Sequence, residues 1–257
     1  MRCRGADCRT GPAAPGPAGA PWDDRCRMPT ERTSRTRAVF LDALGTLVKL
    51  DAPWPALARG LAERHDVEVS LEDARRAMLT EMAHYRANCV RAGDPDSLAR
   101  LRLECAEILR LQLAPALSGL DAAAIVSTML DALSFSAYDD AVGALERWRE
   151  TGLQTVVVSN WDISLHDVLA AIGLRDLLDG VVCSAEVGVS KPASAPFERA
   201  LELAGVLPEQ VVHIGDSVAE DVAGARAAGI EAVLLDRGAS GLEPPAGVRV
   251  IASLREW

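Results

Sequence analysis

Residues 38–47 read AVFLDALGTL, in which four apolar residues lead into one carboxylate, Asp42, before the chain turns through Gly45 and Thr46. A short apolar run that ends in a turn is typical of a strand buried in a parallel sheet. An acid at the end of such a strand either caps the turn or belongs to a site. This stretch alone leaves both interpretations open, so the rest of the chain has to decide between them.

Similar apolar runs recur later in the chain, and helical patterns separate them. The runs are TVVVSN (155–160), GVVCS (180–184), VVHIGD (211–216), EAVLLD (231–236) and the weaker GVRVI (247–251). Amphipathic stretches lie at 163–174, 195–205 and 218–229, and each is followed or closed by a glycine where a helix would end. This alternation predicts an α/β fold with a parallel sheet and right-handed crossovers.

The long interval after the first strand predicts an insertion. The first strand ends at residue 42 and the next begins at 155, whereas the later strands follow one another at spacings normal for a strand–helix unit. Four helical patterns fill the interval, at 54–65, 70–90, 97–113 and 122–133. We therefore expect an all-helical insertion at 53–137, a core made of 38–52 and 138–257, and a separate tail at 1–37.

Charge and composition limit the partners. The formal net charge is -10, although the first 37 residues carry an excess of arginine. An acidic body does not suit a nucleic-acid partner. The tail spaces its arginines with Pro, Gly and Ala, so we expect it to be disordered, with Met28 as an alternative start. The absence of a signal-like or membrane-spanning apolar segment, and six cysteines without paired spacing, predict a cytoplasmic protein with no membrane partner.

Polar groups follow four of the predicted strands. They are Asp42, Ser159 with Asn160, Lys191 one short loop after its strand, and Asp216 with Asp221 one helical turn on. Each has an ordinary explanation, such as a turn cap, a loop start or a helix N-cap. Because ligands of open parallel sheets bind at the carboxyl ends of the strands, we expect the four groups to meet. Their combination favours a site over four unrelated caps.

The chemistry that these groups suit is phosphoryl transfer. A carboxylate such as Asp42 can attack phosphorus and form an aspartyl-phosphate. Mg²⁺ binds one or two protein carboxylates, which Asp42 and Asp216 can supply, and Asp221 can complete the metal site. Lys191 and the hydroxyl of Ser159 would stabilise the transferring oxygens.

The motifs DALGT, the serine of VVVSN, the lysine of SKP and GDSVAED, with GARAAG after them, resemble the haloacid dehalogenase superfamily of hydrolases. The resemblance implies a Rossmann-like core with a helical cap of the subfamily I kind at 53–137. It implies Asp42 as nucleophile, Ser159 as phosphate ligand, Lys191 as charge anchor and Asp216 as a ligand of Mg²⁺. The residue at the place of Leu44 gives the metal its backbone carbonyl in this family.

The side chain of Leu44 departs from the family pattern, because phosphatases of this family usually have there an aspartate that protonates the leaving group. A positioned general acid–base contributes roughly 10²–10⁴ in rate. His84 and Tyr85 of the insertion are alternative proton donors. The competing interpretation is that both residues occupy ordinary surface or core positions of a helix. Asn160 and Trp161, which follow Ser159, are expected to line the substrate pocket.

Several functions fit these residues. The preferred one is a Mg²⁺-dependent phosphatase or phosphotransferase acting on a small phosphorylated metabolite. A metal-independent 2-haloacid dehalogenase also lacks the second acid, but it has little use for Asp216 and Asp221. A phosphonoacetaldehyde hydrolase needs a cap lysine, and residues 53–137 contain none. An inactive protein that binds a phosphate compound or a partner also remains open.

Overall fold

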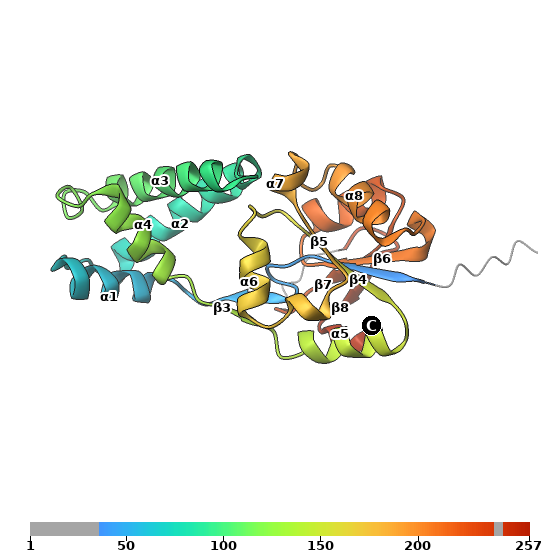
Figure 1. The fold of residues 1–257 in the computed structure, drawn as a ribbon. Coiled ribbons are helices and arrows are strands. Elements are labelled where there is room, and N and C mark those ends of the chain that lie inside the picture. The colour runs from blue at the N-terminus through green and yellow to red at the C-terminus, as the bar shows by residue number, and fades with distance from the viewer. Residues whose placement is uncertain (1–35, 239–243) are drawn as a thin grey trace, which may run out of the picture. The chain divides into compact units, whose positions relative to one another are not determined.

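A computed structural model describes residues 36–238 and 244–257, so the predicted tail lies almost entirely outside the described residues. Six parallel strands form one sheet in the order β5–β4–β1–β6–β7–β8 (Figure 1). The strands are β1 (Ala38–Leu41), β4 (Gln154–Ser159), β5 (Gly180–Cys183), β6 (Val211–Gly215), β7 (Glu231–Leu235) and β8 (Arg249–Ile251). The predicted α/β fold is confirmed, with the first strand at the centre of the sheet.

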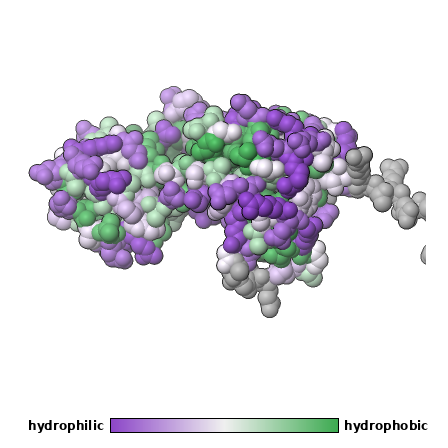
Figure 2. All heavy atoms as spheres, turned by 90° about the horizontal axis from the view of Figure 1, so that it is seen from below, coloured by the Kyte–Doolittle hydropathy of each residue, from purple (hydrophilic) through white to green (hydrophobic). Residues whose placement is uncertain are grey.

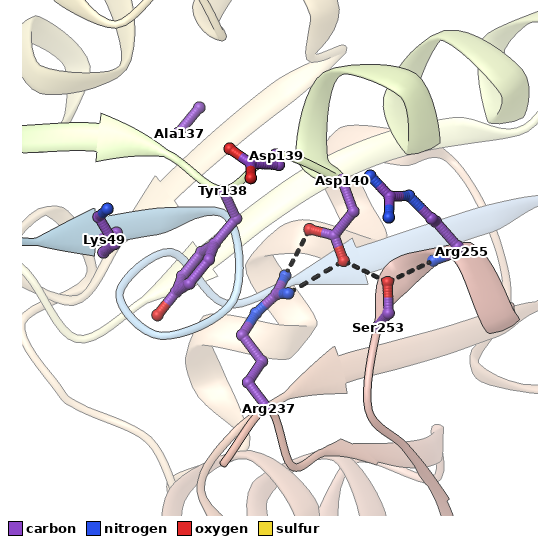
Figure 3. Close-up of a pocket in the computed structure, with 8 residues that line it drawn as sticks. All are labelled: Lys49, Ala137, Tyr138, Asp139, Asp140, Arg237, Ser253 and Arg255. Carbon is purple, nitrogen blue, oxygen red and sulfur yellow. Dashed lines mark hydrogen bonds and ion pairs between the residues drawn. The ribbon is translucent and has the colours of Figure 1, made fainter.

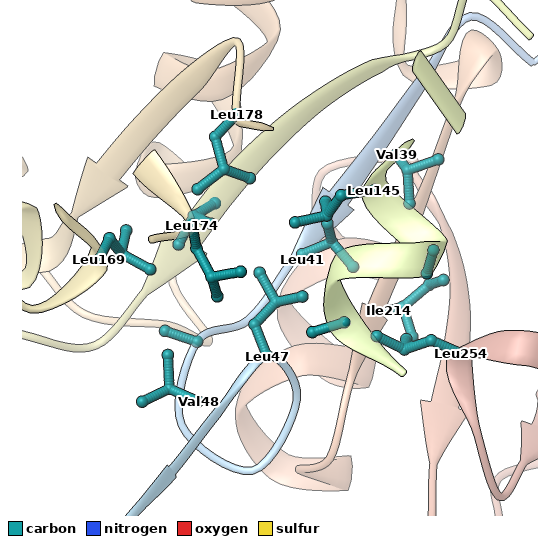
Figure 4. Close-up of a cluster of buried hydrophobic side chains, with 14 of the residues drawn as sticks. Val39, Leu41, Leu47, Val48, Leu145, Leu169, Leu174, Leu178, Ile214 and Leu254 are labelled. Atoms are coloured by element: carbon teal, nitrogen blue, oxygen red, sulfur yellow. The ribbon is translucent and has the colours of Figure 1, made fainter. Parts of the chain in front are cut away.

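Both faces of β1 are buried, which explains its uninterrupted apolar sequence. Val39 and Leu41 belong to one hydrophobic cluster, whereas Ala38 and Phe40 belong to another, because successive side chains of a strand point to opposite faces. Figure 4 shows the first of these clusters, in which Leu145 of a neighbouring helix lies beside the strand.

Helices and short helical turns connect the strands, and one more turn follows the last strand. They are α5 (Ala141–Glu150), α6 (Leu165–Ala171), η3 (Arg175–Leu177), α7 (Ser184–Val187), α8 (Ala195–Ala204), η4 (Pro208–Gln210), the π-helix η5 (Val218–Val222), α9 (Ala223–Ala227) and η6 (Leu254–Glu256). The predicted stretch 218–229 is thus helical, but it begins with a π-turn. Helix α5 and the short α7 were not predicted.

Four helices and a short 3₁₀ turn lie between β1 and α5 in the chain. They are α1 (Trp54–His65), α2 (Leu71–Asn88), η2 (Cys89–Arg91), α3 (Pro95–Gln112) and α4 (Ala122–Asp131). Side chains of Ser70, Asp94 and Asp121 accept hydrogen bonds from the first turns of three of these helices, as N-caps do. The four helices share one hydrophobic cluster, and they lie together as one group in Figure 1. This helical insertion is consistent with a cap of subfamily I, whereas its exact boundaries stay a prediction.

Two short antiparallel strands, β2 (Val48–Leu50) and β3 (Phe135–Ala137), stand on either side of the insertion in the chain. The sequence did not predict this pair, because three residues are too few for a recognisable alternation. On the face of the molecule shown in Figure 2, hydrophobic residues lie in patches among hydrophilic ones. None of the described helices is long and apolar enough to cross a membrane.

Candidate active site

The central strand β1 ends between its two neighbours at the point where the order of the sheet reverses. The chain leaves β1, builds β4 and β5 on one side, and returns to build β6 on the other side. Such a switch point is where open α/β sheets bind their ligands. Asp42 follows β1, Ser159 ends β4 and Asp216 follows β6, so these three residues reach the same place.

Lys191 joins the groups at this switch point. Its ammonium donates three hydrogen bonds, to Oδ1 of Asp42 (2.6 Å), to Oδ1 of Asp221 (2.6 Å) and to the carbonyl of Val158 (2.8 Å). All three of its N–H groups therefore have an acceptor. Burial alone would lower the pKa of Lys191, but the charges of Asp221 and Asp42 outweigh it and raise the pKa. The side chain thus stays a cation although it is only 1% exposed.

Asp42 is held by a second donor, since Ser159 Oγ donates to its Oδ1 at 3.0 Å. Burial raises the pKa of the Asp42 carboxyl, and the charge of Lys191 opposes that effect without cancelling it. The carboxylate therefore depends on a nearby cation to stay ionised. The four predicted groups do meet, and Asp42 lies where Ser159 and Lys191 converge.

Asp221 reaches the site from the π-turn η5 (Val218–Val222). Its Oδ2 accepts a hydrogen bond from the backbone of Ser217 (3.0 Å), and the ring Nε2 of His213 lies 2.9 Å from its Oδ1. Burial would raise the pKa of Asp221, but Lys191 and His213 lower it well below its usual range. A Cβ at Gly215 would lie 2.2 Å from the Asp221 carboxyl carbon, so glycine is required there for Asp221 to fold back.

His213 was not singled out by the sequence analysis. It lies fully buried within β6, and the apolar sequence of that strand does not indicate a residue that contacts Asp221. Only its spacing of eight residues from Asp221 could have suggested the pair.

Asp42, Asp216 and Asp221 form a candidate metal-binding group, because ligand atoms of all three lie within 4.8 Å of one another. Burial of its carboxyl, together with the charges of Asp42 and Asp221, raises the pKa of Asp216 to about 7. The residue as a whole remains exposed. Three carboxylates with a single neighbouring ammonium carry excess negative charge, and oxygen ligands of this kind suit Mg²⁺.

Gly45 makes room for the Asp216 carboxylate. Its φ is 88°, and a Cβ at this position would lie 2.1 Å from Oδ2 of Asp216. Only a residue without a side chain allows the turn after Asp42 and the carboxylate of Asp216 to approach so closely. The turn and the acidic group therefore fit each other as parts of one site.

The side chain of Asn160 holds the backbone of Lys191 from both sides. Its Nδ2 donates to the Lys191 carbonyl at 3.0 Å, and its Oδ1 accepts from the Lys191 N–H at 2.7 Å. Nδ2 also donates to Glu220 (3.0 Å), whose other oxygen lies 3.8 Å from Arg86 of the insertion. These contacts position Lys191, and the predicted role of Asn160 in substrate binding stays a prediction.

Trp161 and Leu44 lie in different surroundings. The Trp161 side chain is buried against Phe135, with ring centroids 5.4 Å apart, and its backbone bonds to Ser184. Leu44 keeps 36% of its surface exposed in the turn after Asp42. Substrate contact by Trp161 and metal ligation by the Leu44 carbonyl both stay predictions.

Tyr85 of the insertion contacts the core, and its hydroxyl donates to Oδ2 of the buried Asp162 at 2.7 Å. Burial, reinforced by the charge of Asp162, raises the pKa of Tyr85 far above its usual range. A hydroxyl with this partner is poorly suited to giving a proton to a leaving group. His84 pairs instead with Glu104 on the neighbouring helix (3.3 Å).

A cavity of about 250 Å³ lies beside the ion pair of Arg237 and Asp140 (Figure 3). Its walls are Lys49, Ala137, Tyr138, Asp139, Asp140, Arg237, Ser253 and Arg255. Arg237 pairs with the buried Asp140 through two bonds of 2.8 and 2.9 Å, and it donates to the carbonyls of Gly45 (3.2 Å) and Thr46 (2.7 Å). The cavity contains none of the catalytic candidates, but Arg237 supports the turn that follows Asp42.

Comparison with known sequences identifies a family and several similar proteins. Residues 36–229 match the family described as haloacid dehalogenase-like hydrolase. "Haloacid dehalogenase-like hydrolase domain-containing protein 3" of Bos taurus is 42% identical over 38% of this chain and 39% of its own length. Its Mus musculus counterpart is 29% identical over 81% of this chain and 83% of its own. A phosphoserine phosphatase of Thermus thermophilus is 36% identical over 46% and 49%, respectively.

Solved structures share the fold at low identity. The protein YfnB from Bacillus subtilis, described as bound to magnesium, covers 86% of this chain and 96% of its own, with a TM-score of 0.66 and 18% identity. A 2-haloacid dehalogenase from Pseudomonas syringae covers the same shares with a TM-score of 0.60 and 21% identity. A phosphatase from Thermococcus onnurineus covers 86% and 95%, with a TM-score of 0.57 and 24% identity. The fold alone therefore does not separate phosphatases from dehalogenases.

Proposed function

Because the chain belongs to the haloacid dehalogenase-like hydrolases, we propose that it is a Mg²⁺-dependent phosphatase or phosphotransferase for a small phosphorylated metabolite. The observation that carries this proposal is the shared ammonium of Lys191, which contacts Asp42 and Asp221 beside the exposed Asp216. A halide-displacing enzyme that uses no metal has no need for two further carboxylates next to its nucleophile. The predicted cytoplasmic location stays a prediction.

Asp42, Asp216 and Asp221 are the residues that would hold Mg²⁺, with the Leu44 carbonyl as a further ligand. The ion would neutralise the negative charge that gathers when a phosphate approaches a carboxylate. The raised pKa of Asp216, about 7, supports this assignment, because a cation beside the group would favour its ionised form.

Asp42 attacks phosphorus in the proposed reaction. A bond forms between its carboxylate oxygen and phosphorus while the bond from phosphorus to the leaving oxygen breaks. Water then attacks phosphorus of the aspartyl-phosphate, which releases phosphate and restores the Asp42 carboxylate. Lys191 and Ser159, which touch Asp42, would hold the phosphoryl oxygens during both steps.

The leaving oxygen needs a proton, and Leu44 cannot supply one. Tyr85 is bonded to Asp162 and strongly disfavours ionisation. We therefore expect the enzyme to prefer substrates whose leaving groups are acidic enough to depart without a donor, or substrates that carry their own acid. This preference limits the substrate class without naming one metabolite.

The test is a panel of phosphate esters assayed with and without Mg²⁺, beside a halide-release assay on 2-chloropropionate. Mg²⁺-dependent phosphate release that Asp42→Asn abolishes supports the proposal. Halide release without a metal would overturn it in favour of a dehalogenase. Absence of both activities, combined with tight phosphate binding, would instead indicate a binding protein.

A further inference from the structure

Three side chains that the proposed reaction does not use come together on the core. They are His166 of α6, Cys183 at the end of β5 and Glu186 of α7. Their ligand atoms all lie within 4.8 Å of one another, and Nε2 of His166 lies 3.0 Å from Oε1 of Glu186. The consecutive elements β5 and α7, together with α6, thus contribute one sulfur, one carboxylate oxygen and one nitrogen to the same place.

We propose that His166, Cys183 and Glu186 bind a thiophilic divalent cation, with Zn²⁺ as the best match. A set of imidazole, thiolate and carboxylate suits zinc, and three protein ligands leave a fourth position for water. The all-oxygen group of Asp42, Asp216 and Asp221 suits Mg²⁺ instead. The two sites would therefore select different metals by the chemistry of their donors.

The geometry needs only small side-chain movements to hold an ion. Zinc bonds of about 2.0 to 2.3 Å in tetrahedral arrangement put neighbouring ligand atoms about 3.3 to 3.8 Å apart. Nε2 of His166 and Oε1 of Glu186, 3.0 Å apart, lie slightly closer than this range, and no two of the three ligand atoms are more than 4.8 Å apart. The side chains of His166 and Glu186 are 37% and 43% exposed, so they are free to adjust by rotation.

The thiol of Cys183 forms the floor of the site, because this residue is fully buried while its two partners face solvent. An ion can therefore enter from the surface and be held from below. Burial raises the pKa of Cys183 to about 12, so the thiol carries its proton at neutral pH. Binding of the cation would displace that proton into solution.

The site lies one strand away from the catalytic candidates. Cys183 is the register partner of Ser159 on the neighbouring strand, and Ser184 bonds to the backbone of Trp161. A bound cation would tie helix α6, through His166, to helix α7, through Glu186. The proposed site shares no ligand with the acidic group of Asp42, Asp216 and Asp221.

The experiment titrates the full chain with Co²⁺ under reducing conditions and excess Mg²⁺, following the thiolate-to-cobalt charge-transfer absorption. A background variant replaces the tail cysteines at 3, 8 and 26 by serine, so that they give no signal. We expect one equivalent of Co²⁺ to bind in this background, with release of one proton and displacement by Zn²⁺. A background protein without the absorption would overturn the proposal.

Ligand variants in the same background identify the site. Cys183→Ser should abolish the absorption, and His166→Gln and Glu186→Gln should each weaken binding at least about 100-fold, since even outer-shell changes cost 10–100-fold. The matched control is His84→Gln, because His84 also pairs with a glutamate but belongs to no such group within residues 36–238 and 244–257. If Cys183→Ser does not fold, the two exposed variants decide. Unchanged affinity in both would refute the assignment, whatever the phosphatase assays show.

Discussion

Replacing Gly45 by alanine should separate the activity of this protein from its stability. Gly45 has a φ of 88°, and an added Cβ would lie 2.1 Å from Oδ2 of Asp216. The left-handed backbone costs an alanine about 1–2 kcal/mol. The collision itself costs little stability, because the obstructing atom is the end of a side chain that can turn away.

The same movement is costly for catalysis. A Cβ essentially never has a neighbouring atom closer than 3.0 Å, so the Asp216 oxygen has to move away by about 0.9 Å. A misplacement of about 1 Å can lower a rate about 10²-fold. We therefore expect Gly45→Ala to lower kcat/KM about 10²-fold and to raise the Mg²⁺ concentration needed for half-maximal activity.

Gly152→Ala is the matched control, because Gly152 has a φ of 78° and no atom within 4 Å of the added Cβ. Both variants should lose a similar 1–2 kcal/mol in urea denaturation, whereas only Gly45→Ala should lose activity. Steady-state kinetics with a Mg²⁺ titration measures the difference. Equal rates in the two variants would refute the role assigned to the close approach of Gly45 and Asp216.

Three further outcomes are expected. Lys191→Met should destabilise the fold by about 3–5 kcal/mol in urea denaturation, because it leaves two buried carboxylates without their cation; a loss below 1 kcal/mol would contradict this. Hydrogen bonds from Arg237, Ser253 and a backbone N–H overcome burial and lower the pKa of Asp140 to about 2. The ionised Asp140 therefore contributes its full stabilisation of the fold above about pH 4, and this stabilisation is lost as the pH falls through 2. The stability difference between wild type and Asp140→Asn should shrink over that interval, and a constant difference would argue against the ion pair. Leu44→Asp should speed hydrolysis of esters with poor leaving groups by roughly 10²–10⁴, while no gain would mean that another group already gives the proton.

The sequence predicted the sheet well because parallel strands buried on both faces are continuous apolar runs. AVFL (38–41) and VVHIG (211–215) were recognisable for that reason, and the polar residues after them located the site. The strands Val48–Leu50 and Phe135–Ala137 escaped prediction, because a three-residue strand carries almost no periodicity.

Contacts between distant parts of the chain were also hidden. Tyr85 and Asp162 are 77 residues apart, and Arg237 and Asp140 are 97 apart, so neither pair leaves a local pattern. The π-turn at Val218–Val222 is similarly invisible, since its sequence reads like an ordinary amphipathic helix with a Ser217 cap. The turn that brings Asp221 to Lys191 is thus a backbone detail that no local pattern predicts, although it also needs the glycine at 215.

The central place of β1 has a consequence for biosynthesis. Phe40 pairs with Val156 on one side and His213 on the other, so both partners of the central strand leave the ribosome long after it does. At about 5–20 residues per second, β4 follows β1 by roughly 6 to 23 s and β6 by roughly 9 to 35 s. The helical insertion, whose contacts are local, can fold during that delay, whereas AVFL stays an unpaired apolar segment. Nascent chains arrested before residue 154 should therefore depend on chaperones, and this dependence should end once β6 has been made.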